Sequence, residues 1–177
     1  RIAIPQGDYQ GTLQSMAVLI DLIEVGVGEK GSIGICTPGA LSPATGLLRN
    51  SNSVCMNGKP VLTDLQESLQ RKIRIANDAN CFALSEATDG AAEGYDMGFG
   101  GILGTGFGGG IAFGGSAHTC MNAIAGEWGH NPLPWPDNKT EHPGPTCYCG
   151  KSGCLETFLS GPALRRDHVL SGGDDID

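Results

Sequence analysis

Three cysteines lie within the eight residues from Cys147 to Cys154, and this cluster constrains the fold more than any other feature of the sequence. The segment reads Cys-Tyr-Cys-Gly-Lys-Ser-Gly-Cys, so two glycines lie between the second cysteine and the third. Cys147 and Cys149 are too close for an easy mutual disulfide, whereas thiolates on a tight glycine turn can converge on one ion. A Cys₃His set is a standard closed, structural site for Zn²⁺. The spacing therefore predicts a zinc-binding loop, with ordinary thiols as the alternative.

Two histidines are candidates for the fourth ligand. His130 ends a Gly-Glu-Trp-Gly-His run upstream of the cysteines, and His142 is closer to them in a polar, proline-rich loop. We expect His130, because the residues around His142 carry little information. The predicted zinc ligands are therefore His130, Cys147, Cys149 and Cys154. Glu127 and Glu156 stand beside these ligands, where a bound metal would fix both carboxylates to accept hydrogen bonds from hydroxyls; two solvated glutamates are the plainer interpretation.

The charge balance and the cysteines restrict the partners and the compartment. The formal net charge is −8 without a cluster of lysines and arginines, which argues against nucleic acid as the main partner. No apolar run approaches the ~20 residues of a membrane span, and no signal peptide opens the chain. We therefore expect no membrane contact, reduced thiols for the seven cysteines and a cytoplasmic location.

Helical and strand patterns alternate along the chain, which indicates an α/β class. Apolar residues at helical spacing follow Asp8, a plausible N-cap. Thr63 begins a capping box that predicts a helix to about Lys72, and an apolar strand over residues 73–76 precedes a second helix over residues 79–92. Two strands around a glycine turn are expected between residues 97 and 113, and the chain ends in an acidic tail over residues 171–177.

Asp78 is the first candidate for chemistry, because it directly follows the apolar strand and precedes the helix. Carboxylates at strand carboxyl ends face the crevice of an open α/β sheet, where ligands bind. The start of the following helix adds a positive dipole end. An N-cap aspartate with no other duty is an equally good interpretation from these residues alone.

The glycine run from Gly104 to Gly110 is the second candidate, because its amides could wrap an anion. No Gly-Lys-Ser/Thr follows it, and no helix opens after it, so it is neither a Walker loop nor a dinucleotide fingerprint. A glycine-rich β-turn is the commoner explanation of such a run.

Taken together, these motifs resemble the signature of the ROK family, which contains sugar kinases and sugar-responsive repressors related to hexokinase. The matching motifs are Asn-Asp-Ala-Asn from Asn77, the glycine run, Gly-Glu-Trp-Gly-His, and Cys-x-Cys-Gly-x-x-Gly-Cys-x-Glu. The resemblance spans about residues 31–162. Pro-Leu-Pro-Trp after His130 and Glu-Thr-Phe-Leu-Ser-Gly from Glu156 are most similar to the bacterial fructokinase and mannokinase branch.

The resemblance implies a hexokinase/actin-like (ribonuclease H-like) two-lobe fold. Residues 1–93 would be the remainder of the N-terminal lobe, with the substrate loop and the catalytic aspartate. Residues 94–177 would begin the C-terminal lobe, with a phosphate loop and the zinc loop. The Asp-x-Gly-Gly-Thr phosphate loop that opens the family and its C-terminal adenosine motif are not found, so we expect an internal part of the family's chain.

The resemblance also implies the site residues and ligands. Asp78 matches the base that deprotonates the sugar hydroxyl. The matching hexose ligands are Asn52, Asn77, Glu127, His130 and Glu156. The matching phosphate ligands are Gly104, Thr105, Gly106, Gly108 and Gly109. Structural Zn²⁺, Mg²⁺ with ATP, and a homodimer complete the expectation.

The expected reaction is the ATP-dependent phosphorylation of a hexose, with fructose converted to fructose 6-phosphate as the first choice. Kinases of an N-acetylhexosamine or of glucose are alternatives within the same reaction. A sugar-sensing ROK-type transcriptional repressor domain is an alternative from another class, and a bare zinc-stabilised interaction module is a third, although it leaves Asp78 unexplained.

Overall fold

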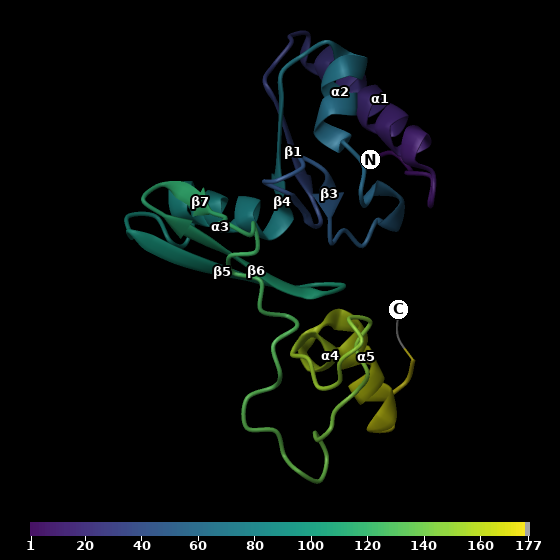
Figure 1. Cartoon of the computed structure of the whole chain (residues 1–177), viewed down its shortest axis with the longest axis vertical. Coiled ribbons are helices and arrows are strands. Elements are labelled where there is room, and N and C mark those ends of the chain that lie inside the picture. The colour runs from purple at the N-terminus through teal and green to yellow at the C-terminus, as the bar shows by residue number, and fades with distance from the viewer. Residues whose placement is uncertain (176–177) are drawn as a thin grey trace. The chain divides into compact units, whose positions relative to one another are not determined.

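The computed structural model describes residues 1–175, and within them the chain forms two compact units. Unit 1 comprises Arg1–Cys81 together with Cys120–Ile124, and unit 2 comprises Phe82–Thr119 and the chain from Ala125 onward (Figure 1). The chain passes from the first unit to the second within helix α3 (Asp78–Asp89). The last two residues of the predicted acidic tail lie outside the described residues. The lobe boundary after residue 93 stays a prediction.

Unit 1 is built on two parallel strands covered by two helices. Strand β1 (Ile33–Thr37) pairs with β4 (Ile73–Asn77), and Thr37 lies opposite Asn77 at the carboxyl ends. Helix α1 (Tyr9–Val27) packs against α2 (Val61–Leu69), as Figure 1 shows. The buried core lies between these elements and includes Leu13, Leu48, Met56, Val61, Leu65 and Ile73. Burial of these apolar side chains is the main source of stability for the unit.

The predicted start of α1 is confirmed, whereas that of α2 is wrong. The Asp8 carboxylate accepts a hydrogen bond of 3.0 Å from the N–H of Gly11 and caps α1. Helix α2 begins at Val61 after Pro60, two residues before the expected capping box, and it has no side-chain cap. Val61 and Leu65 are 2% and 0% exposed, respectively. Their burial in the core places the start of the helix, which overrides the local capping signal.

A tight turn links β1 to a small hairpin of β2 (Ala40–Leu41) and β3 (Leu48–Arg49). A short 3₁₀ helix, η1 (Val54–Met56), follows the hairpin. Gly39 in this turn has a φ of 79°. A Cβ atom there would lie 2.3 Å from the carbonyl oxygen of Arg49. Only glycine therefore allows this backbone approach, which brings the chain after β1 against β3.

Unit 2 contains an antiparallel sheet and the cysteine loop. Strand β5 (Met97–Leu103) pairs with β6 (Phe107–Phe113), which in turn pairs with β7 (Ser116–His118). The predicted strand pair is confirmed, but Gly108, Gly109 and Gly110 lie within β6, and the turn contains only residues 104–106. After the cysteine loop come α4 (Glu156–Leu159) and α5 (Gly161–Leu170). In the described part of the chain, no helix is long and apolar enough to cross a membrane.

Candidate functional site

The four predicted metal ligands lie together in unit 2. The ligand atoms of His130, Cys147, Cys149 and Cys154 all lie within 4.8 Å of one another. The Sγ atoms of Cys149 and Cys154 are 3.6 Å apart, and His130 Nδ1 is 3.4 Å from Cys147 Sγ. Tetrahedral bonds of ~2.3 Å to sulfur and ~2.0–2.1 Å to nitrogen separate neighbouring ligand atoms by roughly 3.5–3.8 Å. The donor set therefore fits Zn²⁺, and it includes His130 and not His142.

Backbone hydrogen bonds explain how the short cysteine segment closes around one point. The N–H of Cys147 donates to the Lys151 carbonyl at 2.7 Å, and the N–H of Gly150 donates to the Cys147 carbonyl at 3.0 Å. Gly150 has a φ of 86°, which favours glycine. Farther out, isolated bridges join Thr146 to Ser152 and Pro132 to Cys154. The loop therefore presents its thiols from one narrow hairpin.

The thiols differ in their surroundings. Burial raises the pKa of Cys154 to about 12, whereas the backbone N–H of Lys151 lowers the pKa of Cys149. The thiolate is the form that binds a metal. Burial favours the neutral thiol of Cys154, so metal binding there would release its proton.

Tyr148, which the sequence analysis did not single out, contacts the second ring nitrogen of His130. The Tyr148 hydroxyl lies 2.9 Å from His130 Nε2, and the two rings meet edge to face at 5.0 Å. The side chain is 83% exposed. Partial burial of its phenol and the nearby Glu156 carboxylate raise the pKa of Tyr148. The sequence gives no signal for this contact beyond the place of Tyr148 between two cysteines.

Glu156 connects the metal loop to the glycine hairpin. Its Oε2 accepts a hydrogen bond of 3.0 Å from the N–H of Phe107, and its own N–H donates to the Gly129 carbonyl at 2.9 Å. A Cβ atom at Gly106 would lie 2.6 Å from the same Oε2. Glu127 also reaches the hairpin, because its Oε2 would lie 3.8 Å from a Cβ atom at Gly108. Both carboxylates therefore lie beside the turn end of β5 and β6.

Aromatic packing fixes the Gly-Glu-Trp-Gly-His run on the same hairpin. The Trp128 ring stacks on Phe107 with centroids 4.9 Å apart and meets Phe99 edge to face, also at 4.9 Å. Its Nε1 donates to the Gly108 carbonyl at 3.4 Å. A Cβ atom at Gly129 would lie 1.9 Å from the Phe107 carbonyl oxygen, so this position requires glycine. These aromatic contacts, which the sequence analysis also missed, hold Glu127 and His130 in place.

In unit 1, Asn77 and Asp78 form the corner between β4 and α3. Asp78 is exposed, and its Oδ1 accepts hydrogen bonds from the N–H of Ala79 at 2.9 Å and from Asn77 Nδ2 at 3.1 Å. Asn77 is buried; its Nδ2 also donates to the Gly39 carbonyl at 3.1 Å, and its Oδ1 accepts from the N–H of Asn80 at 3.0 Å. These contacts orient Asp78 and leave its Oδ2 for other partners. Asn52 is exposed on the loop after β3.

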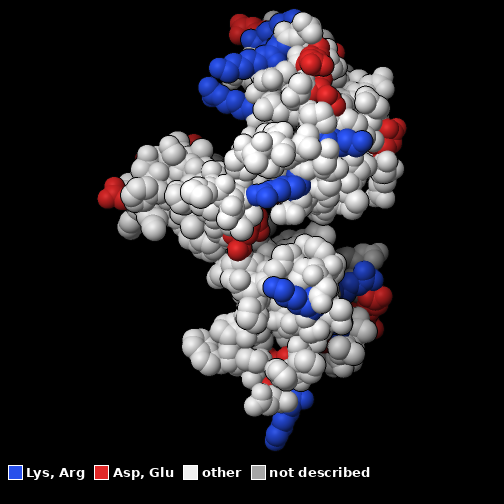
Figure 2. All heavy atoms as spheres, viewed as in Figure 1, with Lys and Arg blue, Asp and Glu red and all other residues white. Residues whose placement is uncertain are grey.

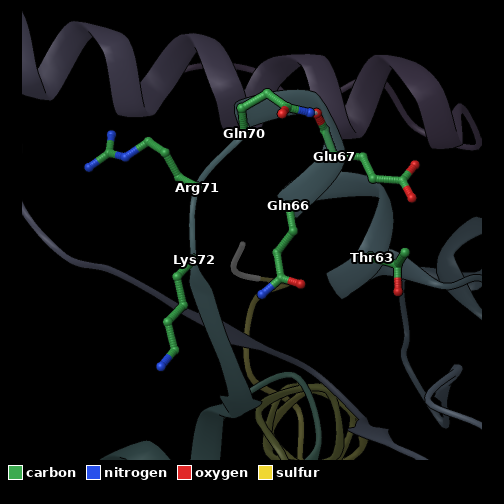
Figure 3. A pocket seen from close by; sticks show the side chains of 6 residues that line it. All are labelled: Thr63, Gln66, Glu67, Gln70, Arg71 and Lys72. Atoms are coloured by element: carbon green, nitrogen blue, oxygen red, sulfur yellow. The ribbon is translucent and has the colours of Figure 1, made fainter.

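Two hollows in the described surface of unit 1 lie apart from these residues. One, of about 500 Å³, is lined by side chains from α2 and the turn that follows it (Figure 3), and a neighbouring one has about 420 Å³. Both include Arg71 and Lys72, and the second adds Arg74. Figure 2 shows lysine and arginine side chains gathered over this end of unit 1. Neither hollow contains a predicted site residue, and Arg71 is paired with Glu24 at 2.6 Å.

Comparisons with known proteins agree over nearly the whole chain. The profile of the ROK family matches residues 1–174. An N-acetyl-D-glucosamine kinase of Pectobacterium atrosepticum is 42% identical over 167 residues, covering 91% of this chain and 54% of the relative. The N-acetylgalactosamine kinase AgaK of Shewanella sp. strain ANA-3 is 39% identical over 179 residues, covering 100% of this chain and 58% of the relative. The chain thus spans about half the length of the curated relatives it matches.

Solved structures give the same result. A ROK hexokinase from Thermus thermophilus superposes with a TM-score of 0.78 at 31% identity, over 99% of this chain and 57% of that one. A ROK family glucokinase from Streptomyces griseus, in complex with glucose and AMPPNP, superposes with a TM-score of 0.74 at 26% identity, over 93% of this chain and 50% of that one. A ROK family transcriptional regulator, a homolog of the E. coli MLC protein, superposes with a TM-score of 0.72 at 25% identity, over 92% of this chain and 40% of that one. The expected α/β fold of the hexokinase/actin-like type is confirmed.

Proposed function

Because the chain belongs to the ROK family, we propose that it is part of an ATP-dependent kinase that phosphorylates a hydroxyl of an N-acetylhexosamine. The observation that carries the substrate is the 39–42% identity to kinases named for N-acetylglucosamine and N-acetylgalactosamine. This replaces fructose, which the sequence motifs favoured, because the similar curated proteins reported above are named for N-acetylated hexoses. Glucose, which the similar glucokinase binds, is the nearest competing substrate.

Asp78 serves as the general base. Hydrogen bonds from Ala79 and Asn77 fix its Oδ1, so Oδ2 can take the proton of the attacking sugar hydroxyl. A positioned general base contributes typically ~10²–10⁴-fold to a rate. Asn77 uses its amide to orient Asp78, and the second lone pair of its Oδ1 can accept from a sugar hydroxyl. Asn52, on the exposed loop after β3, is a further hexose ligand in this proposal.

Glu127, His130 and Glu156 hold the hexose from the metal loop. The two carboxylates accept hydrogen bonds from ring hydroxyls, and Glu156 has Oε1 available for this while Oε2 binds Phe107. Zn²⁺ held by His130, Cys147, Cys149 and Cys154 would have no open coordination position and would brace the loop. The protein thus positions the sugar, which accounts for much of the rate in phosphoryl transfer.

The turn of the glycine hairpin is the proposed phosphate site. Gly104, Thr105 and Gly106 form this turn, and the Gly104 N–H closes it by donating to the Gly106 carbonyl at 2.9 Å. The amides of Thr105 and Gly106 and the Thr105 hydroxyl can donate to the phosphates of the substrate ATP, which is bound with Mg²⁺. Gly108 and Gly109, the other two proposed phosphate ligands, follow the turn within β6. Gly109 also has a packing reason for its lack of a side chain, since a Cβ atom there would lie 2.6 Å from Cζ of Phe99.

The test is a substrate panel on the complete protein from which this chain comes. ATP-dependent phosphorylation of N-acetylglucosamine, N-acetylgalactosamine, glucose and fructose is followed by the release of ADP. We expect the highest kcat/KM for one of the N-acetylated sugars and no turnover without sugar. A preference for fructose or glucose would overturn the substrate, and the absence of phosphorylation with every sugar would overturn the kinase.

A sugar-sensing regulator is the second candidate, because the likeness to the ROK family transcriptional regulator covers 92% of the chain. A regulator needs to bind the hexose without transferring phosphate. The exposed, oriented Asp78 favours the kinase, since ligand binding alone does not require a base. Hexose binding without ADP release in the panel would support the regulator instead.

A further inference from the structure

His130 uses its two ring nitrogens for different partners. Nδ1 faces the thiols, 3.4 Å from Cys147 Sγ, and Nε2 faces the Tyr148 hydroxyl at 2.9 Å. A neutral imidazole carries one N–H, so a metal on Nδ1 requires the proton to be on Nε2. The Tyr148 oxygen is then the acceptor of the Nε2–H hydrogen bond. It therefore stabilises the tautomer of His130 that binds the metal.

We infer that Tyr148 is a positioning residue for the metal centre and that a hexose hydroxyl replaces it on His130 Nε2 when the sugar binds. The second half of this inference rests on the proposed function, in which His130 is a hexose ligand. Partners of this kind orient the histidine of a metal site, and their loss typically lowers metal affinity ~10–100-fold.

The exposure of Tyr148 makes the replacement feasible. Its side chain is 83% exposed, whereas the neighbouring ligands Cys147 and Cys154 are 4% and 1% exposed. An exposed aromatic side chain can change rotamer without opening a cavity in the core. The phenol can thus leave His130 while the buried ligands Cys147 and Cys154 stay in place.

The sign of the effect on sugar binding follows from competition for one donor. Before the sugar can accept from Nε2, the hydrogen bond to Tyr148 has to break. The net effect of one such hydrogen bond on an equilibrium constant is about 2- to 10-fold. Tyr148→Phe keeps the ring and removes the hydroxyl. The variant should therefore bind the hexose more tightly and retain zinc more weakly while no sugar is present.

The experiment compares zinc-loaded complete protein with its Tyr148→Phe variant, and Tyr95→Phe serves as the matched control. Tyr95 is another exposed tyrosine of unit 2, at 73%. Transfer of zinc to a chromophoric chelator is measured without sugar and with saturating N-acetylglucosamine. Sugar affinity is measured by titration calorimetry.

We expect Tyr148→Phe to lose zinc ~10–100-fold more readily without sugar, to lose this difference when sugar is present, and to bind sugar about 2- to 10-fold more tightly. Unchanged zinc retention would overturn the positioning role. Weaker sugar binding would overturn the replacement, because it would show that the phenol itself binds the hexose. If the wild-type protein binds no hexose, the proposed function and the replacement both fail, while the zinc transfer without sugar still decides the positioning role.

Discussion

One carboxylate oxygen of Glu156 lies 3.0 Å from the backbone nitrogen of Phe107 and accepts its hydrogen bond. Glu156 is the second residue after the last metal ligand, Cys154, and Phe107 is the first residue of β6 after the glycine turn. A second bond near it, from the N–H of Gly161 to the Gly104 carbonyl at 2.8 Å, ties the same turn to α5. A proposed hexose ligand is therefore also a support of the proposed phosphate site.

This relationship predicts that Glu156→Ala weakens the binding of both substrates. Hexose affinity should fall because an acceptor is lost, and AMPPNP affinity should fall about 2- to 10-fold because the turn loses the Phe107 hydrogen bond. Asn52→Ala, at a proposed hexose ligand on the exposed loop after β3 in unit 1, is the control, with a loss of hexose affinity alone. Titration calorimetry on the complete protein measures both ligands. Equal AMPPNP affinities in the two variants would contradict the prediction.

One zinc ion per chain is the second prediction. Elemental analysis of protein purified without chelator should find it, and Cys149→Ser should retain less than about a tenth of it, because removing a ligand disturbs the site at least as strongly as removing an outer partner. Cys36→Ser, at an exposed cysteine in β1 of unit 1, is the control and should retain all of it. The absence of metal in the wild type, or a disulfide between any two cysteines of the loop, would disprove the metal centre.

Asp78→Asn should lower kcat by ~10²–10⁴-fold in the complete protein, because the amide cannot act as the base. Its oxygen can still accept from the N–H of Ala79, so the start of α3 and hexose affinity should persist within a few-fold. Asp89→Asn, at the other end of the helix, controls for the loss of charge. Near-normal kcat in Asp78→Asn, or loss of hexose binding in a folded variant, would rule out the proposed role.

The Glu24–Arg71 ion pair predicts a pH-dependent contribution to stability. The hydrogen bond from Arg71 lowers the pKa of Glu24. Because the folded-state pKa lies below the ordinary value, the contribution is present above that value and is lost as the pH falls through the lowered pKa. Glu24→Gln should therefore lower the urea midpoint of the complete protein at pH 7, and the gap from wild type should narrow toward about pH 3. Glu29→Gln is the control and should have the urea midpoint of the wild type. A difference in midpoint between Glu24→Gln and wild type that does not change with pH would contradict the role of the ion pair.

Features set by neighbouring residues could be predicted from the sequence. Cysteine spacing predicted the grouping of His130 with three thiols, and the strand-then-carboxylate pattern placed Asp78 at the start of α3. The Asp8 cap of α1 was found in the same way. In each case the physical cause lies within one segment of the chain or between motifs with strong local signatures.

Features set by packing between distant residues could not be predicted. Val61 begins α2 because the core buries it, although the capping signal lies two residues later. The glycines of β6 match an anion-binding pattern, yet Gly109 lies against the Phe99 ring, where a Cβ atom would come within 2.6 Å of Cζ. The role proposed for Tyr148 depends on its contact with His130, 18 residues away in the sequence.

Gly106 shows how easily a defect in this molecule could be assigned to the wrong substrate. A side chain at this position would meet the Glu156 carboxylate at 2.6 Å before it could reach any nucleotide. In a genetic screen, a Gly106 variant would be recorded as a lesion of the glycine-rich loop and hence of nucleotide binding. Its first atomic effect would be to displace Glu156, a proposed hexose ligand, so a loss of hexose affinity should accompany any loss of nucleotide affinity.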